Sequence, residues 1–490
     1  MALTTINAQS LPPGSYVFED VKGRLPAQIS DFSRAYIFLE GSSGNYASPL
    51  QIVSAEDAET QFGIAGVGLA SIENLFLHNR RAVLFGIRVP IGQVHQVGVA
   101  GAGDDSYSVT VDGVQASYTS SGSEDADDII DGLMAAINDT QSGVASLVIA
   151  TNPDYDNDTF ELRSLDPATT AETPLVITAS TGGTGSVTDT DLTPSDPSPQ
   201  DWVWAIQNSF DPDLHRPGFL LAPEAFNNMS EASDRLSVGT ALTDFAETND
   251  YLAVIDPGSG FSSVADYQAD GLQYSSSRGH AAYYCPYVTN LNDMDLPPSS
   301  YAVGTALRRY EVEGFHQPPA GGSYQLRNVK GTSVHIPEAQ HSTLNNDHNI
   351  NVIKQMFSAG FQIRGARTRT DSALFNTVTD RVIFNVLLES LRRTLNRFVF
   401  ESIDGDLELF RAIRRTVNSI LHRLWSGGVL FGQDPSKAFE VICDRSNNPP
   451  ADLEAGRVNV TIFAVPSPFV EKLVSTANRV AIGEVQFYRR

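Results

Sequence analysis

Short continuous apolar runs constrain the fold of this chain more than any other feature. They occur at 35–39, 82–89 and 251–255, and a similar run at 218–222 precedes a helical pattern over 230–248. Runs of this length without alternation are typical of strands buried on both faces, as in a sheet covered by helices. Because such strands alternate here with helices, we predict a layered α/β (α+β) core in a multidomain chain.

The length and composition allow several domains. The chain has 490 residues, of which 41% are hydrophobic and 19% are charged, as in ordinary folded proteins. It contains no apolar run of about 18 residues, so we expect no membrane span. Residues 1–21 contain no Lys or Arg and no long apolar stretch, so we expect no secretory signal and a chain made in the cytoplasm.

A strongly acidic segment interrupts the core pattern after Val89. Between Ile91 and Gln200 the only Lys or Arg is Arg163, and the segment holds well over half of the net charge of −25. Alternating runs such as 107–111, followed by the turn pair Asp112-Gly113, predict strands, and the spacing over 126–138 predicts a helix. The glycine-rich 182–185 and the proline-rich 194–199 are typical of a closing linker. We therefore predict an outward-facing insertion that is mixed or β-rich.

Two amphipathic helices are predicted near the C-terminus. Between 374 and 400 apolar residues form a helical stripe, and a second stripe follows a turn at 404–405, with Asp404 as its N-cap. Arginines lie away from both stripes, in a protein that is acidic as a whole. Exposed arginines on such helices usually form a solvated face. These arginines are Arg392, Arg393, Arg397, Arg411, Arg414, Arg415 and Arg423.

Both ends of the chain contain strand-like residues. Chain ends usually fray unless another segment holds them, so strand patterns there are unusual. The residues concerned are Tyr16, Val17 and Phe18 near the start, and Ile482, Val485 and Phe487 near the end.

Motifs that carry chemistry are largely missing from the sequence. There is no Gly-Lys pair for a phosphate loop, no G-x-S-x-G and no H-E-x-x-H. The histidines at 335, 341 and 348 match no metal-site spacing, and the acidic run 154–158 lacks the later residues of a calcium loop. Cys285 and Cys443 are expected to be buried free thiols. We predict that the chain has no catalytic, cofactor or metal site and that it is not an enzyme.

From about Tyr251 to its end the chain resembles the contractile tail sheath family of phages, shared with pyocin-like particles. The resemblance depends on an ordered set of segments that covers roughly half of the chain. The most specific segment is 424–432, LWSGGVLFG. The others include 283–288, 296–304, 314–321, 360–368, 438–444, 447–449 and 465–470. Where the family often has an acidic residue after the late proline pair, this chain has Phe469, followed by Val470 and Glu471, so the contact made there stays open.

The resemblance implies a structural subunit that polymerises helically around a tail tube. The sheath would contract from a metastable extended state and drive the tube through the host envelope. The implied partners are other copies of the chain, the tail tube protein, and the baseplate and tail terminator proteins. The net charge of −25 argues against a nucleic-acid partner, and without a membrane span we expect no membrane insertion. The implied location is the tail sheath of a virion, assembled in the host cytoplasm.

The resemblance also assigns roles along the chain. The terminal arms would add strands to sheets of neighbouring subunits, and the seven arginines become candidates for contact with an acidic tube. The implied divisions are an N-terminal arm at 1–22, a core at 23–90 and 200–365, an acidic outer insertion at 91–199, an inner tube-facing α/β domain at 366–478, and a C-terminal arm strand at 479–490.

Two alternatives remain open at this point. One is the sheath of a bacterial injection device, either pyocin-like or type VI-like. Type VI sheaths are usually split between two chains, whereas this is a single chain of 490 residues. The other is a glycan-binding adhesin that uses the acidic segment 91–200.

Overall fold

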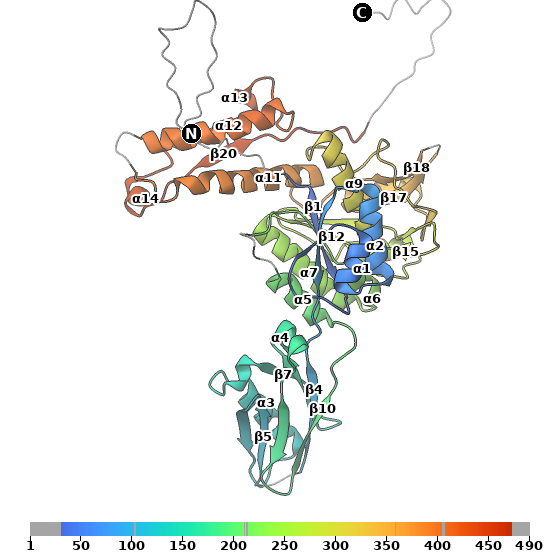
Figure 1. The fold of residues 1–490 in the computed structure, drawn as a ribbon, viewed down its shortest axis with the longest axis vertical. Helices are drawn as coiled ribbons and strands as arrows, with labels where there is room; N and C mark the ends of the chain where they lie inside the picture. Colours follow the sequence, from blue (N-terminus) through green and yellow to red (C-terminus); the bar gives the residue numbers. More distant parts are fainter. Residues whose placement is uncertain are drawn as a thin grey trace, which may run out of the picture.

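The molecule is elongated, and three parts follow one another along its long axis (Figure 1). The computed structural model describes residues 31–101, 104–209, 211, 214–357, 359–403 and 407–472. A C-terminal layer lies at one end, a sheet with helices on both faces lies in the middle, and the acidic insertion lies at the other end. The predicted fold class, a multidomain α/β (α+β) chain, is confirmed.

The central sheet has eight strands, and its inner strands are parallel. Adjacent strands from β17 to β3 pair in parallel, while the edge strands β2 and β18 are antiparallel to their neighbours. The strands predicted at 35–39, 82–89 and 251–255 are therefore confirmed as members of a parallel sheet. In spatial order the strands are β18 (Gly360–Arg364), β17 (Asn351–Met356), β13 (Ala281–Cys285), β12 (Leu252–Ile255), β11 (Phe219–Leu221), β1 (Arg34–Leu39), β3 (Val83–Arg88) and β2 (Leu50–Ile52).

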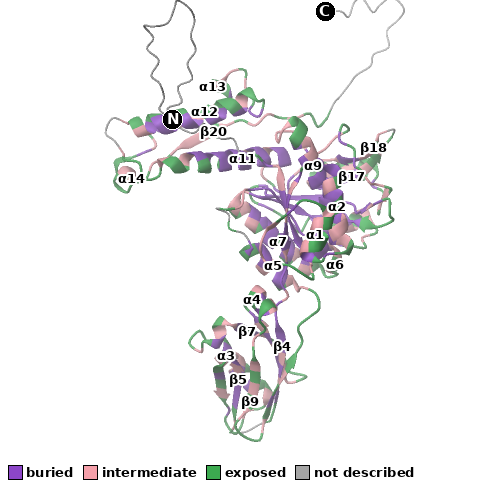
Figure 2. Ribbon diagram, viewed as in Figure 1, coloured by how far each residue is buried: buried purple, intermediate pink, exposed green. Residues whose placement is uncertain are grey.

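Helices bury both faces of this sheet. Successive side chains of a strand point to opposite faces, so Ile37 belongs to the buried cluster of Leu75 and Tyr301 on one side, and Tyr36 belongs to the cluster of Trp202 on the other. Figure 2 shows the buried residues running through the sheet and the inner sides of its helices. The first face carries α1 (Ala55–Phe62), α2 (Gly66–His78) and α9 (Pro298–Glu313). The second carries α5 (Pro199–Asn208), α6 (Pro223–Asn228), α7 (Ala232–Asn249) and α8 (Val264–Gly271).

Smaller elements complete the central part. Three short strands form a separate sheet, and a helix that continues into a π-helical turn precedes β17. These elements are β14 (Val288–Thr289), β15 (Asp295–Leu296), β16 (Gly331–Thr332), α10 (Glu338–Ser342) and the turn η3 (Thr343–Asp347). Cys285 and Cys443 are both free and buried, as predicted.

The insertion contains two small sheets and a helix around its own apolar core. Ile129, Leu133 and Ile137 project from α3 into that core, and the predicted helix at 126–138 is confirmed. One sheet has the order β10-β4-β8-β7, and the other has the order β6-β5-β9. The elements are β4 (Val94–Ala100), β5 (Ser106–Val111), β6 (Val114–Thr119), α3 (Ala126–Asn138), the 3-10 turn η2 (Val144–Ser146), β7 (Val148–Asp154), β8 (Thr159–Ser164), α4 (Pro167–Glu172), β9 (Ile177–Thr181) and β10 (Ser186–Asp191).

One prediction about the insertion is wrong. The glycine-rich residues 182–185 are not part of a closing linker, because they connect β9 to the last strand, β10. The Gly182 N–H bonds to the Ser106 carbonyl at 2.8 Å, and the Gly185 N–H bonds to the Asp105 carboxylate at 2.7 Å. Glycines allow the backbone to approach its neighbours closely here, and the same composition is common in linkers.

The insertion joins the core through two adjacent segments. The Gly92 N–H donates to Asp201 Oδ1 at 3.2 Å, and Arg163 Nη1 donates to Ser198 Oγ at 3.1 Å. Ser198 and Asp201 also form the capping box that begins α5. The two chain crossings therefore lie side by side against the first turn of one helix.

The C-terminal layer consists of two long helices and a two-stranded sheet. Both predicted helices are present, as α11 (Val378–Leu395) and α12 (Glu408–Ser426). The prediction that Asp404 caps the second helix is wrong, because α12 begins at Glu408 with Leu407 in the cap position. Asp404 itself lies outside the described residues. The other elements are the turn η4 (Asn396–Phe398), α13 (Pro435–Ala438), β19 (Phe439–Ile442), α14 (Pro450–Glu454) and β20 (Thr461–Ala464).

Candidate interaction site

The two long helices of the C-terminal layer pack through their apolar stripes. Leu387 and Leu391 of α11 share a buried cluster with Val417, Ile420 and Leu424 of α12. The Thr377 hydroxyl caps α11 by accepting the Asp380 N–H at 3.1 Å. The first part of α11 also packs against the core, with Arg381 and Asn385 buried there, whereas arginines at its end and on α12 lie on the surface.

All seven predicted arginines lie exposed on this layer, and most already have partners. At the end of α11, Arg392 pairs with Glu389 at 3.2 Å and with Asp250 at 2.7 Å, and Arg393 also pairs with Glu389. The Glu389 side chain is only 7% exposed, so a buried carboxylate holds both guanidinium groups in place. Nearby, Arg397 Nη2 donates to Thr416 Oγ1 at 2.6 Å.

A second group of arginines surrounds the start of α12. Arg411 pairs with Glu408, and Arg415 lies 3.8 Å from the same carboxylate. Arg414 lies near Asp444, and the Ser446 hydroxyl and, less strongly, Arg414 hold the pKa of that carboxyl below its usual value. Arg423 is exposed in the last turn of the helix. Two carboxylates thus hold four of the seven arginines in place on the surface of the layer.

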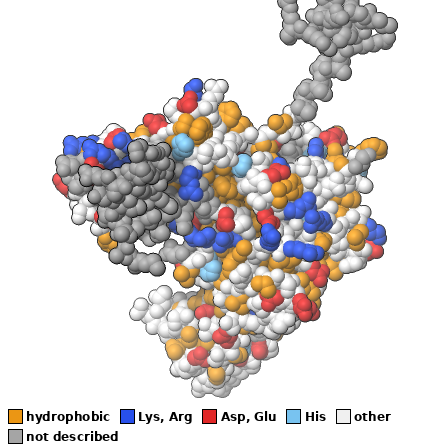
Figure 3. All heavy atoms as spheres, turned by 45° about the horizontal axis from the view of Figure 1, so that its top comes forward, with side chains coloured by type: hydrophobic (Ala, Val, Ile, Leu, Met, Phe, Trp, Pro, Cys, Tyr) orange, Lys and Arg blue, Asp and Glu red, His pale blue; other side chains and the backbone are white. Residues whose placement is uncertain are grey.

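The face seen in Figure 3 shows the resulting contrast in charge. Lys and Arg side chains are spread, among some Asp and Glu, over the upper part of the molecule, whereas the charged side chains seen on the insertion below are mainly Asp and Glu. Whether the seven arginines contact a tube stays a prediction.

The sheet of β19 and β20 has unpaired edges within the described residues. The two strands pair only with each other, from Phe439 opposite Ala464 to Ile442 opposite Thr461. Phe463 on this sheet is 57% exposed. An open groove of about 900 Å³ beside it is lined by residues that include Trp425, Phe431 and Val465. Free strand edges next to exposed aromatic side chains can accept an added strand.

The arm residues predicted from the sequence cannot be placed against this sheet. Tyr16, Val17, Phe18, Ile482, Val485 and Phe487 all lie outside the described residues. Their pairing with a neighbouring subunit remains a prediction.

A strap at 465–472 returns from the C-terminal layer to the core. The Phe431 N–H bonds to the Val465 carbonyl at 2.8 Å, and Arg367 pairs with Glu471 at 2.5 Å. This ion pair involves Glu471, in the segment after the late prolines where the sequence left the local contact open. Because its partners are 104 residues apart, no local pattern could have revealed it.

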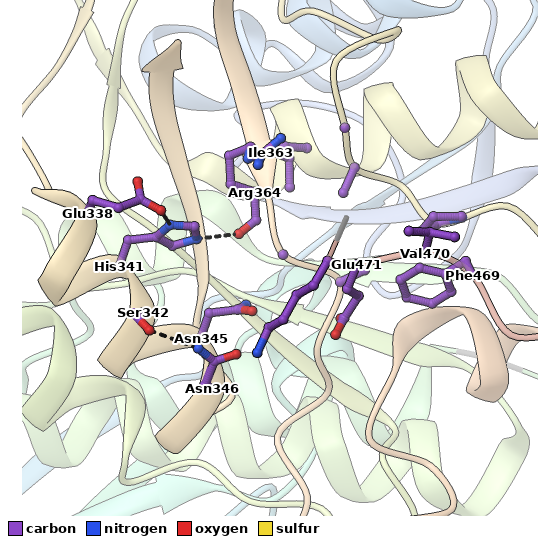
Figure 4. Close-up of a pocket in the computed structure, with 16 residues that line it drawn as sticks. Glu338, His341, Ser342, Asn345, Asn346, Ile363, Arg364, Phe469, Val470 and Glu471 are labelled. Carbon is purple, nitrogen blue, oxygen red and sulfur yellow. Dashed lines mark hydrogen bonds and ion pairs between the residues drawn. The ribbon is translucent and has the colours of Figure 1, made fainter. Parts of the chain in front are cut away.

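A pocket of about 370 Å³ lies between the strap and the core (Figure 4). Glu338, His341 and Asn345 line one side, and Phe469 and Val470 line the other. His341 Nε2 lies 2.7 Å from the Arg364 carbonyl, which can only accept, so Nε2 carries the hydrogen. Within the described residues no group of three or more His, Cys, Asp or Glu could hold a metal ion.

The carboxyl groups whose pKa values are raised most are buried in the core. Burial raises the pKa of Asp256 to about 7 and that of Glu224 to about 8. Asp256 Oδ1 accepts the Ser299 N–H at 2.7 Å at the start of α9, so it acts as a helix cap. Over the described part of the chain, no helix is long and apolar enough to cross a membrane.

Comparisons with known proteins give matches in structure only. No family model matches the chain, and no curated protein matches its sequence. A chain of the contracted sheath complex of PVC, an extracellular contractile injection system, matches with a TM-score of 0.58 at 14% identity, over 97% of this chain and 99% of that chain. A chain of the contracted helical sheath of the anti-feeding prophage matches with a TM-score of 0.56 at 16% identity, over 96% and 100%.

A third match comes from the contracted baseplate structure of the anti-feeding prophage. Its TM-score is 0.58 at 14% identity, over 96% of this chain and 99% of that chain. The protein therefore shares its fold with chains of these assemblies along nearly its whole length.

Proposed function

We propose that this protein is the structural subunit of a contractile sheath, which polymerises helically around a tail tube and contracts from a metastable extended state. One observation supports this above all: the fold match runs from end to end of both chains, over 97% of this chain and 99% of a chain of the PVC sheath complex. A match over one part would support only a shared module. The role is structural, without an enzymatic step.

Polymerisation would use the terminal arms and the open two-stranded sheet. The arms at 1–22 and 479–490 would add strands to β19 and β20 of neighbouring subunits, because main-chain hydrogen bonds form along a free strand edge. A contact between different surfaces that does not close on itself repeats into a helical polymer. The arms would keep subunits connected while their bodies move.

Contraction would take its energy from interfaces between subunits. The seven arginines of the C-terminal layer would face an acidic tube, and Glu389 and Glu408 would hold four of them in place. Loss of those contacts would let subunits rotate into tighter packing. The baseplate and tail terminator proteins would bind the ends of the sheath, in a virion tail or a phage-derived particle.

Negative-stain electron microscopy of the purified protein at high concentration tests this function. We expect hollow striated tubes that survive dilution. A variant truncated after Val480 should stay folded, with unchanged circular dichroism, but form no tubes, because it lacks most of the C-terminal arm. Dispersed monomers of the full chain, even with a tube protein added, would contradict the sheath function. Normal tubes from the truncated variant would contradict only the role of the arm.

A further inference from the structure

Two arginines on the α9 side of the sheet have no acidic partner among the described residues. Arg308 lies 4.9 Å above the Tyr324 ring and donates to the Gln325 carbonyl at 3.3 Å. Arg327 Nη1 donates to the Leu77 carbonyl at 2.7 Å. Arg308 bonds to the carbonyl of Gln325, two residues before Arg327, so the two cations lie near each other. Burial, and then the charge of Arg327, lowers the pKa of Arg308. We call these two residues the arginine site.

The surroundings of the arginine site do not neutralise it. The nearby carboxylates already form ion pairs with other arginines: Glu311 pairs with Arg81 at 3.2 Å, and Glu313 pairs with Arg309 at 2.8 Å. Burial lowers the pKa of His78 to about 4, so this histidine is neutral near pH 7. Neutral backbone carbonyls and an aromatic ring therefore hold two like charges side by side. An anionic partner from outside the subunit would relieve their repulsion.

A groove with the opposite character lies on the other face of the sheet. It has a volume of about 620 Å³ and runs between α5 and α7, with partly exposed Val203, Trp204 and Leu236 along it. Asp234 and Asp244 also line it, and neither forms an ion pair within the described residues. The groove thus combines an indole ring with two carboxylates, a combination that suits guanidinium groups. We call it the acidic groove.

The arginine site and the acidic groove lie on opposite sides of one subunit. The helices α2 and α9 cover one face of the sheet, and α5 and α7 cover the other. The insertion and the C-terminal layer occupy the two ends of the long axis, so both side faces remain accessible (Figure 1). A second copy placed alongside would bring its acidic groove toward the arginine site of the first. This contact joins two different surfaces, so it can repeat from copy to copy without closing.

We propose that Arg308 and Arg327 of one subunit dock in the acidic groove of an adjacent subunit, with Asp234 and Asp244 as their ionic partners. The inference rests on the proposed sheath function, because it describes a lateral contact within that polymer. It concerns the folded bodies of the subunits and requires neither arm.

Charge reversal on each side tests the contact. An acidic variant carries Arg308→Glu and Arg327→Glu, and a basic variant carries Asp234→Arg and Asp244→Arg. Each variant alone should lose self-association by more than about tenfold, because like charges then face each other across the contact. Mixed at low salt, the two variants should associate with each other, since each supplies the partner that the other lacks. Analytical ultracentrifugation measures both results, and about 0.5 M salt should weaken the mixed complex.

A matched control keeps charge effects separate from folding effects. Glu56→Arg with Glu59→Arg reverses two exposed charges on α1 and should leave association unchanged. If the folded acidic and basic variants associate with themselves as the parent protein does, or fail to associate when mixed, the proposed contact is wrong. Analytical ultracentrifugation gives these results whether or not tubes are seen by microscopy. A mixed complex without tubes from the parent protein would support the contact and count against the sheath.

Discussion

Glu224 is a single buried side chain that couples proton binding to the stability of the core. Its carboxylate accepts the Glu40 N–H at 2.7 Å and lies near the first turn of α2, where a Cβ on Gly68 would lie 2.5 Å from it. Burial raises its pKa to about 8, and the Glu40 charge adds to this, while the Glu40 N–H works against it. The folded protein therefore holds this proton at a pH where the unfolded chain has lost it.

This difference predicts that stability falls as pH rises toward the pKa of Glu224. A carboxyl whose folded pKa is raised favours folding at low pH and loses that contribution between its ordinary pKa and the folded value. The free energy of unfolding should drop by about 1 kcal/mol between about pH 7 and about pH 8.5, and Glu224→Gln should remove most of that drop. Urea unfolding at both pH values measures it.

Asp256, His78 and His280 contribute less than Glu224 to the change over that interval. Asp256 has a pKa of about 7, so much of its contribution is lost at lower pH, and His78 and His280, near 4, stay neutral. An unchanged pH dependence in Glu224→Gln would show that another group is responsible.

At the scale of elements, the hairpin of β5 and β6 depends on its two-residue turn. Val111 pairs with Val114, and the backbone φ angles are 49° at Asp112 and 81° at Gly113. Both angles lie in the left-handed region, as a type I′ turn requires, and the predicted turn pair is confirmed. A Cβ on Gly113 would meet no atom within 4 Å.

Gly113→Ala should therefore destabilise the insertion by about 1 kcal/mol through backbone strain alone. Thermal unfolding followed by circular dichroism measures the loss. Gly122→Ala is the matched control, because its Cβ would make only an ordinary contact, at 3.5 Å from Asp104. Equal effects from the two substitutions would contradict the role of the turn.

Sequence patterns predicted the elements whose structure is specified by residues close together in the sequence. The apolar run at 35–39 and the i, i+4 spacing in 126–138 each specify burial without any distant residue. β10 could not be predicted, because SVTDTD is polar and becomes a strand only by pairing with β4, far away in the sequence.

For the arginines of the candidate site, exposure was predictable, and the spacing of Glu389 to Arg393 could also have shown their pairing. The pairing of Arg367 with Glu471 could not be predicted, because it depends on the path of the strap.

For the whole molecule, the insertion is structurally separate from the core. Its buried cluster contains only residues between Val97 and Val187, and both chain crossings meet at the start of α5. Removing it therefore breaks no contact within the two clusters of the central sheet.

We expect a variant in which residues 94–196 are replaced by about four Gly and Ser residues to fold and to form tubes with a thinner wall. Gly92, Ser198 and Asp201 remain, so the start of α5 keeps its cap. Circular dichroism and negative-stain microscopy give the two readouts. A soluble but unfolded product would show that the insertion stabilises the core.

The narrow attachment of the insertion also affects how the sequence of such a chain can change during evolution. Substitutions beyond Gly92 can accumulate, and whole segments can be exchanged there, without a compensating change in the sheet or the C-terminal layer. The far end of the molecule can therefore diverge between lineages at its own rate, under pressures from the surroundings that it meets. In the proposed polymer, the remainder would stay constrained by its fit to other copies of the chain.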